Sequence, residues 1–252
     1  MTRHALVRAG ELLLSLAAFL AAWKLLTVVT GTPEYILPAP EVVAERGVRA
    51  IGSGLLWDHT AATVIEIVLG FGLGAATAIG VGTALGKSVV VERVLSPYIV
   101  AAQAVPILAL APLLDIWFGG GLFARVLVCA LIVFFPIAIA TMVGIRSADP
   151  LLREMLRSLG ATPGQVTTRL EIPSALPVIF GGLRVGVTLS VIGAVVAEWV
   201  SASVGLGVLI NIADQGLFDT PLMFVALAVL AIIGLAFYSL VVLVERRLVH
   251  SA

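Results

Sequence analysis

The sequence predicts an all-α integral membrane protein with about six transmembrane helices and with its N-terminus and C-terminus in the cytoplasm. Of its 252 residues, 60% are hydrophobic and only 12% are charged, whereas about 25% of the residues in a soluble domain are charged. Most of the surface must therefore face lipid or other apolar protein. No repeat or linker divides the chain, so we expect a single transmembrane domain over residues 1–252.

Six stretches are apolar enough to cross a bilayer, each close to the roughly 20 residues that a helical span needs. They are about 11–31, 60–86, 94–114, 122–145, 174–199 and 220–244. The first follows a positively charged start without a clear cleavage site, so we interpret it as an uncleaved signal anchor. The third contains Pro97, Pro106 and Pro112. These prolines predict a kinked helix buried in protein, because neighbouring groups must satisfy the carbonyls that proline frees.

The distribution of Lys and Arg sets the orientation. With a cytoplasmic N-terminus, ten basic residues fall on the cytoplasmic side and two, Arg46 and Arg49, fall outside. The ten are Arg3, Arg8, Lys87, Arg93, Arg146, Arg153, Arg157, Arg169, Arg246 and Arg247. The polar segment of residues 146–173 is therefore cytoplasmic. Outside, a short amphipathic helix is expected from Pro40, and a glycine-marked turn with a short helix is expected within 200–219.

The second span carries glycines at a spacing that allows close helix packing. Gly70 and Gly74, and again Gly82 and Gly86, are small residues four apart. Such pairs let two helix backbones approach each other closely. The pattern fits tight packing within one subunit, and it also fits packing across an interface between subunits.

Three ionisable residues, Glu66, Arg184 and Glu198, lie in or near the spans. Such residues usually face a protein interior or an aqueous path, so we take all three as candidates for a substrate path. Arg184 is deep enough to need a partner or water. Glu198 is near the outer end of its span, where exposure to interfacial water is an equal alternative.

One stretch resembles a phosphate-binding P-loop but departs from the pattern in sequence and in context. VGTALGKS (81–88) has Val81 where the pattern requires glycine. A P-loop also follows a strand and opens a helix, whereas this stretch ends a predicted span. Lys87 is better explained as a cytoplasmic anchor of that span. We expect no ATP binding by this motif.

Other kinds of site are not indicated. His4, His59 and His250 lie far apart without Cys or carboxylates at ligand spacing, so no metal site is expected. The formal net charge is zero, which gives no basic footprint for nucleic acid. No motif for a nucleophile or a zinc protease is present. We therefore expect no catalytic residues and no cofactor in this chain.

The cytoplasmic segment is predicted to contain two short helices. In ADPLLREMLRSLG (148–160), Asp149 is suited to cap a helix and Gly160 to end it. An apolar stripe follows this helix at Leu151, Leu152, Met155, Leu156 and Leu159. The second helix is predicted to start at the cap Thr162 and to stop before Pro173. Two capped helices with an apolar stripe favour a docking surface for another protein.

This segment resembles the cytoplasmic loop in permease subunits of binding-protein-dependent ABC importers, whose pattern is E-A-A, three residues, G, nine residues, I-x-L-P. Glu154 and Gly160 occupy the Glu and Gly positions, while Met155 and Leu156 replace the alanines. The pattern ends at Leu170, Ile172 and Pro173, with Leu and Ile interchanged. The resemblance implies a type I ABC importer permease fold. It also implies a coupling loop that contacts an ATPase through Glu154, Met155, Leu156, Leu159, Gly160, Leu170, Ile172 and Pro173.

The resemblance implies further subunits in the bacterial cytoplasmic (inner) membrane. These are a second permease copy forming a homodimer, two cytoplasmic ABC ATPase subunits that bind ATP and Mg, and an extracytoplasmic solute-binding protein. PEYILPAP, APLLDIWFGGG and VSASVGLGVLI resemble the branch that imports sulfonates, taurine, nitrate, or pyrimidine and riboflavin precursors. The sequence of the last span resembles the pyrimidine- or riboflavin-precursor members more than the others. The expected function is the transmembrane subunit of an ATP-driven importer of a small solute.

Two other functions are compatible with parts of the sequence. A passive channel or membrane scaffold without an ATPase explains the spans, the glycines and the charge bias equally well. It does not explain the spacing of Glu154, Gly160 and Pro173. A membrane enzyme is disfavoured because the spans carry too few polar residues for a catalytic site.

Overall fold

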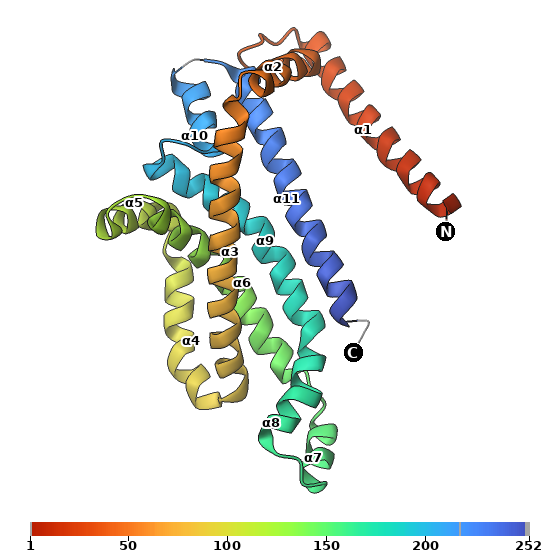
Figure 1. Cartoon of the computed structure of the whole chain (residues 1–252), viewed down its shortest axis with the longest axis vertical. Coiled ribbons are helices and arrows are strands. Elements are labelled where there is room, and N and C mark those ends of the chain that lie inside the picture. The colour runs from red at the N-terminus through yellow and green to blue at the C-terminus, as the bar shows by residue number, and fades with distance from the viewer. Residues whose placement is uncertain (1, 217, 250–252) are drawn as a thin grey trace.

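The computed structural model describes residues 2–216 and 218–249, and every regular element among them is helical (Figure 1). The α-helices are α1 (Thr2–Thr30), α2 (Pro40–Gly52), α3 (Leu55–Lys87), α4 (Val89–Ala104), α5 (Ile107–Phe118), α6 (Leu122–Arg146), α7 (Pro150–Ser158), α8 (Pro163–Val166), α9 (Ile172–Ser201), α10 (Leu206–Asn211) and α11 (Thr220–Val249). Two π-helical turns, η1 (Thr167–Glu171) and η2 (Ile212–Gly216), follow α8 and α10. The prediction of an all-α protein is confirmed.

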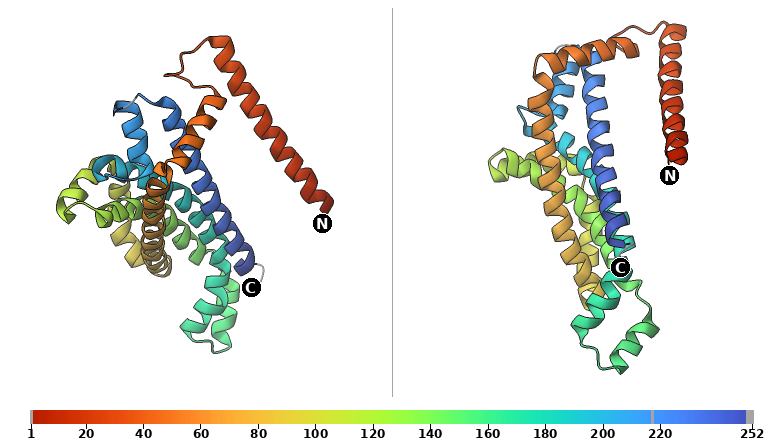
Figure 2. Two further views of the ribbon diagram at one scale, coloured as in Figure 1. Left: turned by 45° about the horizontal axis from the view of Figure 1, so that its top comes forward. Right: turned by 45° about the vertical axis from the view of Figure 1, so that its right-hand side comes forward.

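The spans agree with the sequence prediction. Among the described residues, five helices are long and apolar enough to cross a membrane, or six if α4 and α5 form one bent span. From the end of the molecule that carries α2 and α10, helices α1 and α11 both extend toward the end that carries α7 and α8, and α11 extends further than α1 (Figures 1 and 2). The start of α1 and the end of α11 therefore point to the side that the charge distribution assigns to the cytoplasm.

The third span is broken. Helices α4 and α5 meet at an angle of 97°, so the predicted kink is confirmed, and it falls at Pro106. Proline disfavours the helical conformation of the residue before it, and Val105 is accordingly extended, with ψ at 123°. Within this single chain α4 has no buried residue, so its own helices bury only the α5 part of the third span. The break turns α5 onto the bundle, where Ala111 and Leu114 are buried, and leaves α4 on the outside.

Helix α6 lies between α3 and α9 at the centre of the bundle. A Cβ atom at Gly74 would lie 2.6 Å from the backbone oxygen of Ala130, and one at Gly82 would lie 2.5 Å from that of Ala138. Helix α3 can therefore approach α6 this closely only with glycine at these positions. Of the two alternatives for the glycine pattern, packing within one subunit is confirmed.

Helix α1 stands apart from the other spans (Figure 2). None of the residues in its apolar window is buried. Its outer end contacts the bundle through Trp23, whose ring stacks on that of Phe224 with 5.5 Å between centroids. Lys24 forms an ion pair with Glu41 of α2. The hydrogen bond from Lys24 lowers the pKa of the Glu41 carboxyl group.

Candidate functional site

Helix α7 begins and ends as the sequence predicts. The Asp149 side chain accepts a hydrogen bond from the backbone N–H of Leu151 at 2.8 Å, which caps the helix before Pro150. Just after the helix, Gly160 adopts a φ of +79°, a conformation that side chains other than glycine rarely adopt. The chain therefore turns sharply at Gly160 and enters the second helix.

The second helix starts as predicted but does not stop before Pro173. Thr162 and Gln165 form a reciprocal capping box, with bonds of 3.3 Å and 2.8 Å. From there the helix runs through η1 into α9 without a break. In η1 the backbone N–H of Ile172 bonds to the oxygen of Thr167, five residues earlier. This wider turn shifts the hydrogen-bond ladder just before Pro173, so the chain accommodates the missing N–H of proline.

The apolar stripe of α7 divides into two sets. Leu156 packs against a small core made of Ala148, Val166 and Leu170, which fixes α7 to α8. The outward side chains remain in contact with solvent, with exposed fractions of 74% at Leu151, 53% at Met155 and 76% at Leu159. Contiguous exposed apolar side chains on a polar segment are typical of a protein contact site.

The other residues of the predicted coupling loop follow the same division. Glu154 and Gly160 are exposed beside Met155 and Leu159, and Ile172 is exposed further along the chain. Leu170 is buried in the core beneath α7, and Pro173 is half-buried. The eight predicted residues therefore form an outward face and its internal support.

The cytoplasmic segment is also held by ionic contacts that the sequence analysis missed. The Glu171 carboxylate lies 3.4 Å from Arg153 of α7 and 3.7 Å from Lys87 at the end of α3. Lys87 also donates to the Thr167 hydroxyl group at 2.8 Å. The lysine of the P-loop-like stretch thus connects the second span to η1. In the sequence, the signal for these ion pairs was the presence of opposite charges on segments predicted to be cytoplasmic.

Arg146 joins the cytoplasmic ends of three helices. Its guanidinium group donates to both carboxylate oxygens of Glu92 in α4, at 2.9 Å and 2.7 Å. It also donates to the backbone oxygens of Leu85 and Gly86 in α3. Paired donation from Arg to a carboxylate fixes geometry as well as charge. The cytoplasmic segment therefore begins at a point where α3, α4 and α6 are held together by Arg146.

The structure brings Glu66 and Glu198 together near the outer end of the bundle. Glu66 is fully buried and accepts a bond from Arg125 at 2.6 Å. Glu198 is 1% exposed, so the alternative of exposure to interfacial water is wrong. Its carboxylate accepts from the Thr63 hydroxyl group and from the backbone N–H of Gly207, each at 2.5 Å. The sequence analysis did not identify the partners Arg125, Thr63 and Gly207. The sequence did contain a signal for Arg125, because it and Glu66 carry opposite charges at similar depths in their spans.

These contacts fix the turn between α9 and α10 to the outer end of α3. The backbone N–H of Leu206 donates to the Thr63 hydroxyl group at 2.9 Å, and that of Gly205 donates to His59 Nδ1 at 3.0 Å. A Cβ atom at Gly205 would lie 2.6 Å from Glu198 Oε2, so only glycine fits there. The predicted glycine turn and short helix are present, but α10 is packed into the bundle, with Leu206–Ile210 buried.

Arg184 lies away from this cluster. Its partner is Glu245, near the end of α11, which supplies the partner that its depth requires. The three residues predicted for a substrate path therefore do not converge on one site. Glu66 and Glu198 belong to the outer cluster, and Arg184 connects α9 to α11.

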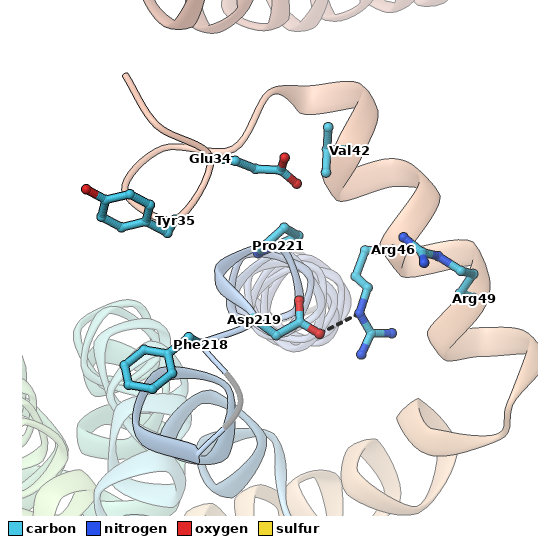
Figure 3. Close-up of a pocket in the computed structure, with 8 residues that line it drawn as sticks. All are labelled: Glu34, Tyr35, Val42, Arg46, Arg49, Phe218, Asp219 and Pro221. Carbon is cyan, nitrogen blue, oxygen red and sulfur yellow. Dashed lines mark hydrogen bonds and ion pairs between the residues drawn. The ribbon is translucent and has the colours of Figure 1, made fainter. Parts of the chain in front are cut away.

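A charged pocket of about 640 Å³ opens at the outer end of the molecule, between α2 and the start of α11 (Figure 3). Arg46 Nε lies 2.7 Å from Asp219 Oδ2 across it. Asp219 also accepts from the backbone N–H of Leu222 and so caps α11. Glu34, Tyr35, Val42, Arg49, Phe218 and Pro221 complete the lining. This ion pair connects the first outer segment to the last span.

No group of three or more His, Cys, Asp or Glu side chains that could hold a metal ion occurs within residues 2–216 and 218–249. His250, one of the three histidines, lies outside the described residues. His59 bonds to the backbone of Gly205. Its role in the structure is to hold the turn before α10.

Comparisons with known proteins agree with this architecture. The family described as "Binding-protein-dependent transport system inner membrane component" matches residues 62–250. The riboflavin transport system permease protein of Chloroflexus aurantiacus is 49% identical over 94% of this chain and 88% of its own length. The formylaminopyrimidine transport permease protein of Halalkalibacterium halodurans is 34% identical over 90% of this chain and 89% of its own length. The taurine transport system permease protein of Escherichia coli is 33% identical over 87% and 82%.

Solved structures show the same fold. A chain of the MetNI methionine ABC transporter, in an inward-facing conformation, matches with a TM-score of 0.66 and 19% identity, covering 77% of this chain and 97% of that one. A chain of an amino acid ABC transporter matches with a TM-score of 0.59 and 24% identity, covering 74% and 90%. These matches confirm the type I importer permease fold.

The family match covers most of the chain, and relatives above 30% identity cover nearly all of it. These relatives are transport components of importers in the inner membrane, which disfavours the passive channel, the scaffold and the membrane enzyme. The chain therefore belongs to the inner membrane components of binding-protein-dependent transport systems, as the permease subunit of an ABC importer.

Proposed function

We propose that two copies of this chain form the membrane pathway of the importer and that α7 and the Gly160 turn dock two cytoplasmic ATPase subunits, which bind ATP and Mg. The exposed apolar face of α7 carries this proposal. Met155 and Leu159 stand in solvent beside Glu154, on the part of the chain that projects furthest from the bundle (Figure 1). An apolar face exposed there is stabilised when a partner covers it.

The connection of this face to the spans supports a mechanical role. Leu156 and the Glu171 ion pairs hold α7 against α8 and η1. From Pro163 to Ser201 the chain is one continuous helix, so a displacement at the docking face moves α9 as a rod. Rigid-body movement of packed helices is a common way to transmit a change between distant sites. All of residues 1–252 would then act as one transmembrane domain.

The names of the relatives support a proposal for the solute. The relative at 49% identity is named for riboflavin, and one at 34% is named for a formylaminopyrimidine. Relatives named for taurine and for aliphatic sulfonates are 33% identical. We propose that this importer carries a riboflavin-type or pyrimidine-type solute. A solute-binding protein would deliver it at the outer end, where the Arg46–Asp219 pocket opens.

A path role for Glu66, Arg184 and Glu198 stays a prediction. Each has a partner within the chain. Such internal pairing supports a structural role in this conformation. A role in the path would require these pairs to separate during transport.

Co-purification tests the proposal. In Leu159→Asp and Met155→Asp variants, a charge replaces an exposed apolar group, so we expect the ATPase subunit no longer to co-purify with the permease. Phe218→Asp is the control, because Phe218 is 79% exposed at the opposite end of the molecule. The ATPase subunit should co-purify normally with the Phe218→Asp variant. Wild-type co-purification and uptake in both α7 variants would contradict the docking assignment.

A further inference from the structure

The break in the third span creates a pocket of about 410 Å³. One side is the last turn of α4, with Ala102 and Gln103, and Pro106 lies at the break. The opposite side is α6, with Leu131, Ile132 and Phe135. The Phe135 ring is held edge-on against Phe134, with 5.3 Å between centroids. The volume falls within the range of about 300–1,000 Å³ that is typical of small-molecule sites.

This pocket lies at the depth where a transported solute must pass. Leu131, Ile132 and Phe135 are in the middle of α6, a helix that is long and apolar enough to span the membrane. Non-helical backbone at membrane depth is tolerated only where protein buries it or where it lines a water-filled cavity. Helix α4 has no buried residue, so the break is available to line such a cavity. Interrupted helices form substrate sites near the bilayer midplane in other transporters.

The lining selects for one kind of solute. Residues 94–114 contain no charged side chain, and none of the residues that line the pocket is charged. A sulfonate or another anion would be unpaired there, at a large desolvation cost. Gln103 offers a hydrogen-bond donor and an acceptor on one exposed amide. Phe135 offers an aromatic face, which favours stacked or edge-on rings.

We propose that this pocket binds the solute during transport and that the solute is a planar, uncharged heteroaromatic ring. Phe135 contacts the ring and Gln103 bonds to its amide-like edge. The inference rests on the proposed importer function and adds both a site and a basis for selectivity. A flavin or an aminopyrimidine has this chemistry, whereas taurine and alkyl sulfonates do not.

The test uses the complete importer, reconstituted in lipid nanodiscs for binding and in vesicles for uptake. The probes are riboflavin, a neutral aminopyrimidine and taurine. Ala102→Trp fills the pocket. Ala101→Trp is its matched control, because Ala101 is an exposed neighbour on α4 outside the lining. We expect at least one ring probe to bind, Ala102→Trp to lower its affinity at least tenfold, and Ala101→Trp to leave its affinity within about twofold.

A second variant tests the polar contact. Gln103→Leu keeps the side-chain size and removes the amide, so we expect ring-probe affinity to fall about three- to tenfold, the effect of losing one or two hydrogen bonds. The inference is overturned if Ala102→Trp and Ala101→Trp behave alike, or if taurine alone shows sensitivity to Ala102→Trp. It is also overturned if a lipid or a second copy of the chain covers the pocket, so that Gln103→Cys is equally protected from a thiol reagent with and without ring probe.

Different results would contradict the importer function and the solute pocket. If the ATPase subunits co-purify and solute uptake depends on ATP, the importer function stands even when the pocket variants have no effect. If the ATPase subunits do not co-purify with the unmodified chain, the importer function itself fails. Co-purification is therefore measured on every variant before solute binding.

Discussion

The Glu198 carboxylate accepts the backbone N–H of Gly207 at 2.5 Å, across the turn that joins α9 to α10. The same carboxylate accepts the Thr63 hydroxyl group of α3. Glu198 therefore connects the outer ends of two spans and a buried turn. Removal of the carboxylate in Glu198→Ala leaves Gly207 N–H and Thr63 without this acceptor.

Because the site is buried, we expect Glu198→Ala to lower the free energy of unfolding by about 3 kcal/mol. Denaturation of the purified protein in detergent measures this loss. Glu45→Ala is the control, since the Glu45 side chain is 73% exposed and its loss should cost less than about 0.5 kcal/mol. Equal stability of the two variants would show that the Glu198 contacts do not hold the turn.

The approach of α3 to α6 depends on glycine. In Gly74→Ala the new Cβ would lie 2.6 Å from the Ala130 oxygen, so the helices must separate, and we expect a loss of about 1–3 kcal/mol. Gly72→Ala is a matched control two residues away, where a Cβ would meet nothing within 4 Å. That variant should be neutral or slightly stabilising, because alanine favours the helix. Equal melting temperatures of the two variants would show that the approach of α3 to α6 does not depend on Gly74.

Arg125 compensates the buried charge of Glu66. Arg125→Leu leaves the Glu66 carboxylate buried without its partner, which typically costs about 3–5 kcal/mol. The double variant Arg125→Leu with Glu66→Leu should be more stable than Arg125→Leu alone, because it removes the unpaired charge. Unfolding curves of the two single variants and the double variant measure this coupling. Strictly additive losses would contradict the pairing.

Glu171 connects the cytoplasmic segment to α3 and α7. Glu171→Gln weakens its contacts with Arg153 and Lys87, each a partly exposed pair worth up to about 1 kcal/mol. The outward face of α7 is unchanged, so we expect the ATPase to dock normally while the solute transported per ATP falls severalfold. Glu45→Gln should leave this ratio unchanged. An unaltered ratio in Glu171→Gln would show that these ion pairs do not transmit motion.

Local features of the sequence predicted much of the fold. Asp149 and Thr162 lie two and three residues, respectively, from the backbone groups that they cap, so their roles were visible in the sequence. The glycine spacing of α3 likewise indicated a close contact. The partner helix of these glycines could not be assigned, because the pattern is the same for a contact within a subunit and one between subunits.

The contacts that sequence reasoning missed join distant residues. Thr63 and Glu198 are 135 positions apart, and Lys87 and Thr167 are 80 positions apart. Which charges meet depends on how the spans pack, and no local pattern records this. The wrong stop before Pro173 had a different cause, because η1 accommodates the proline through a hydrogen-bond shift that the usual rule for proline does not anticipate.

We infer that the turn at Gly160 lets the cytoplasmic segment couple an ATPase to the spans. Gly160 has a φ of +79°, whereas Gly164 lies in α8, and a Cβ at either position would meet nothing within 4 Å. The most direct test compares Gly160→Val with Gly164→Val in ATPase co-purification and in ATP-dependent uptake, with membrane insertion as the common baseline. We expect Gly160→Val to insert normally but to lose both ATPase co-purification and uptake, while Gly164→Val keeps them. Wild-type docking and uptake in Gly160→Val would contradict this inference.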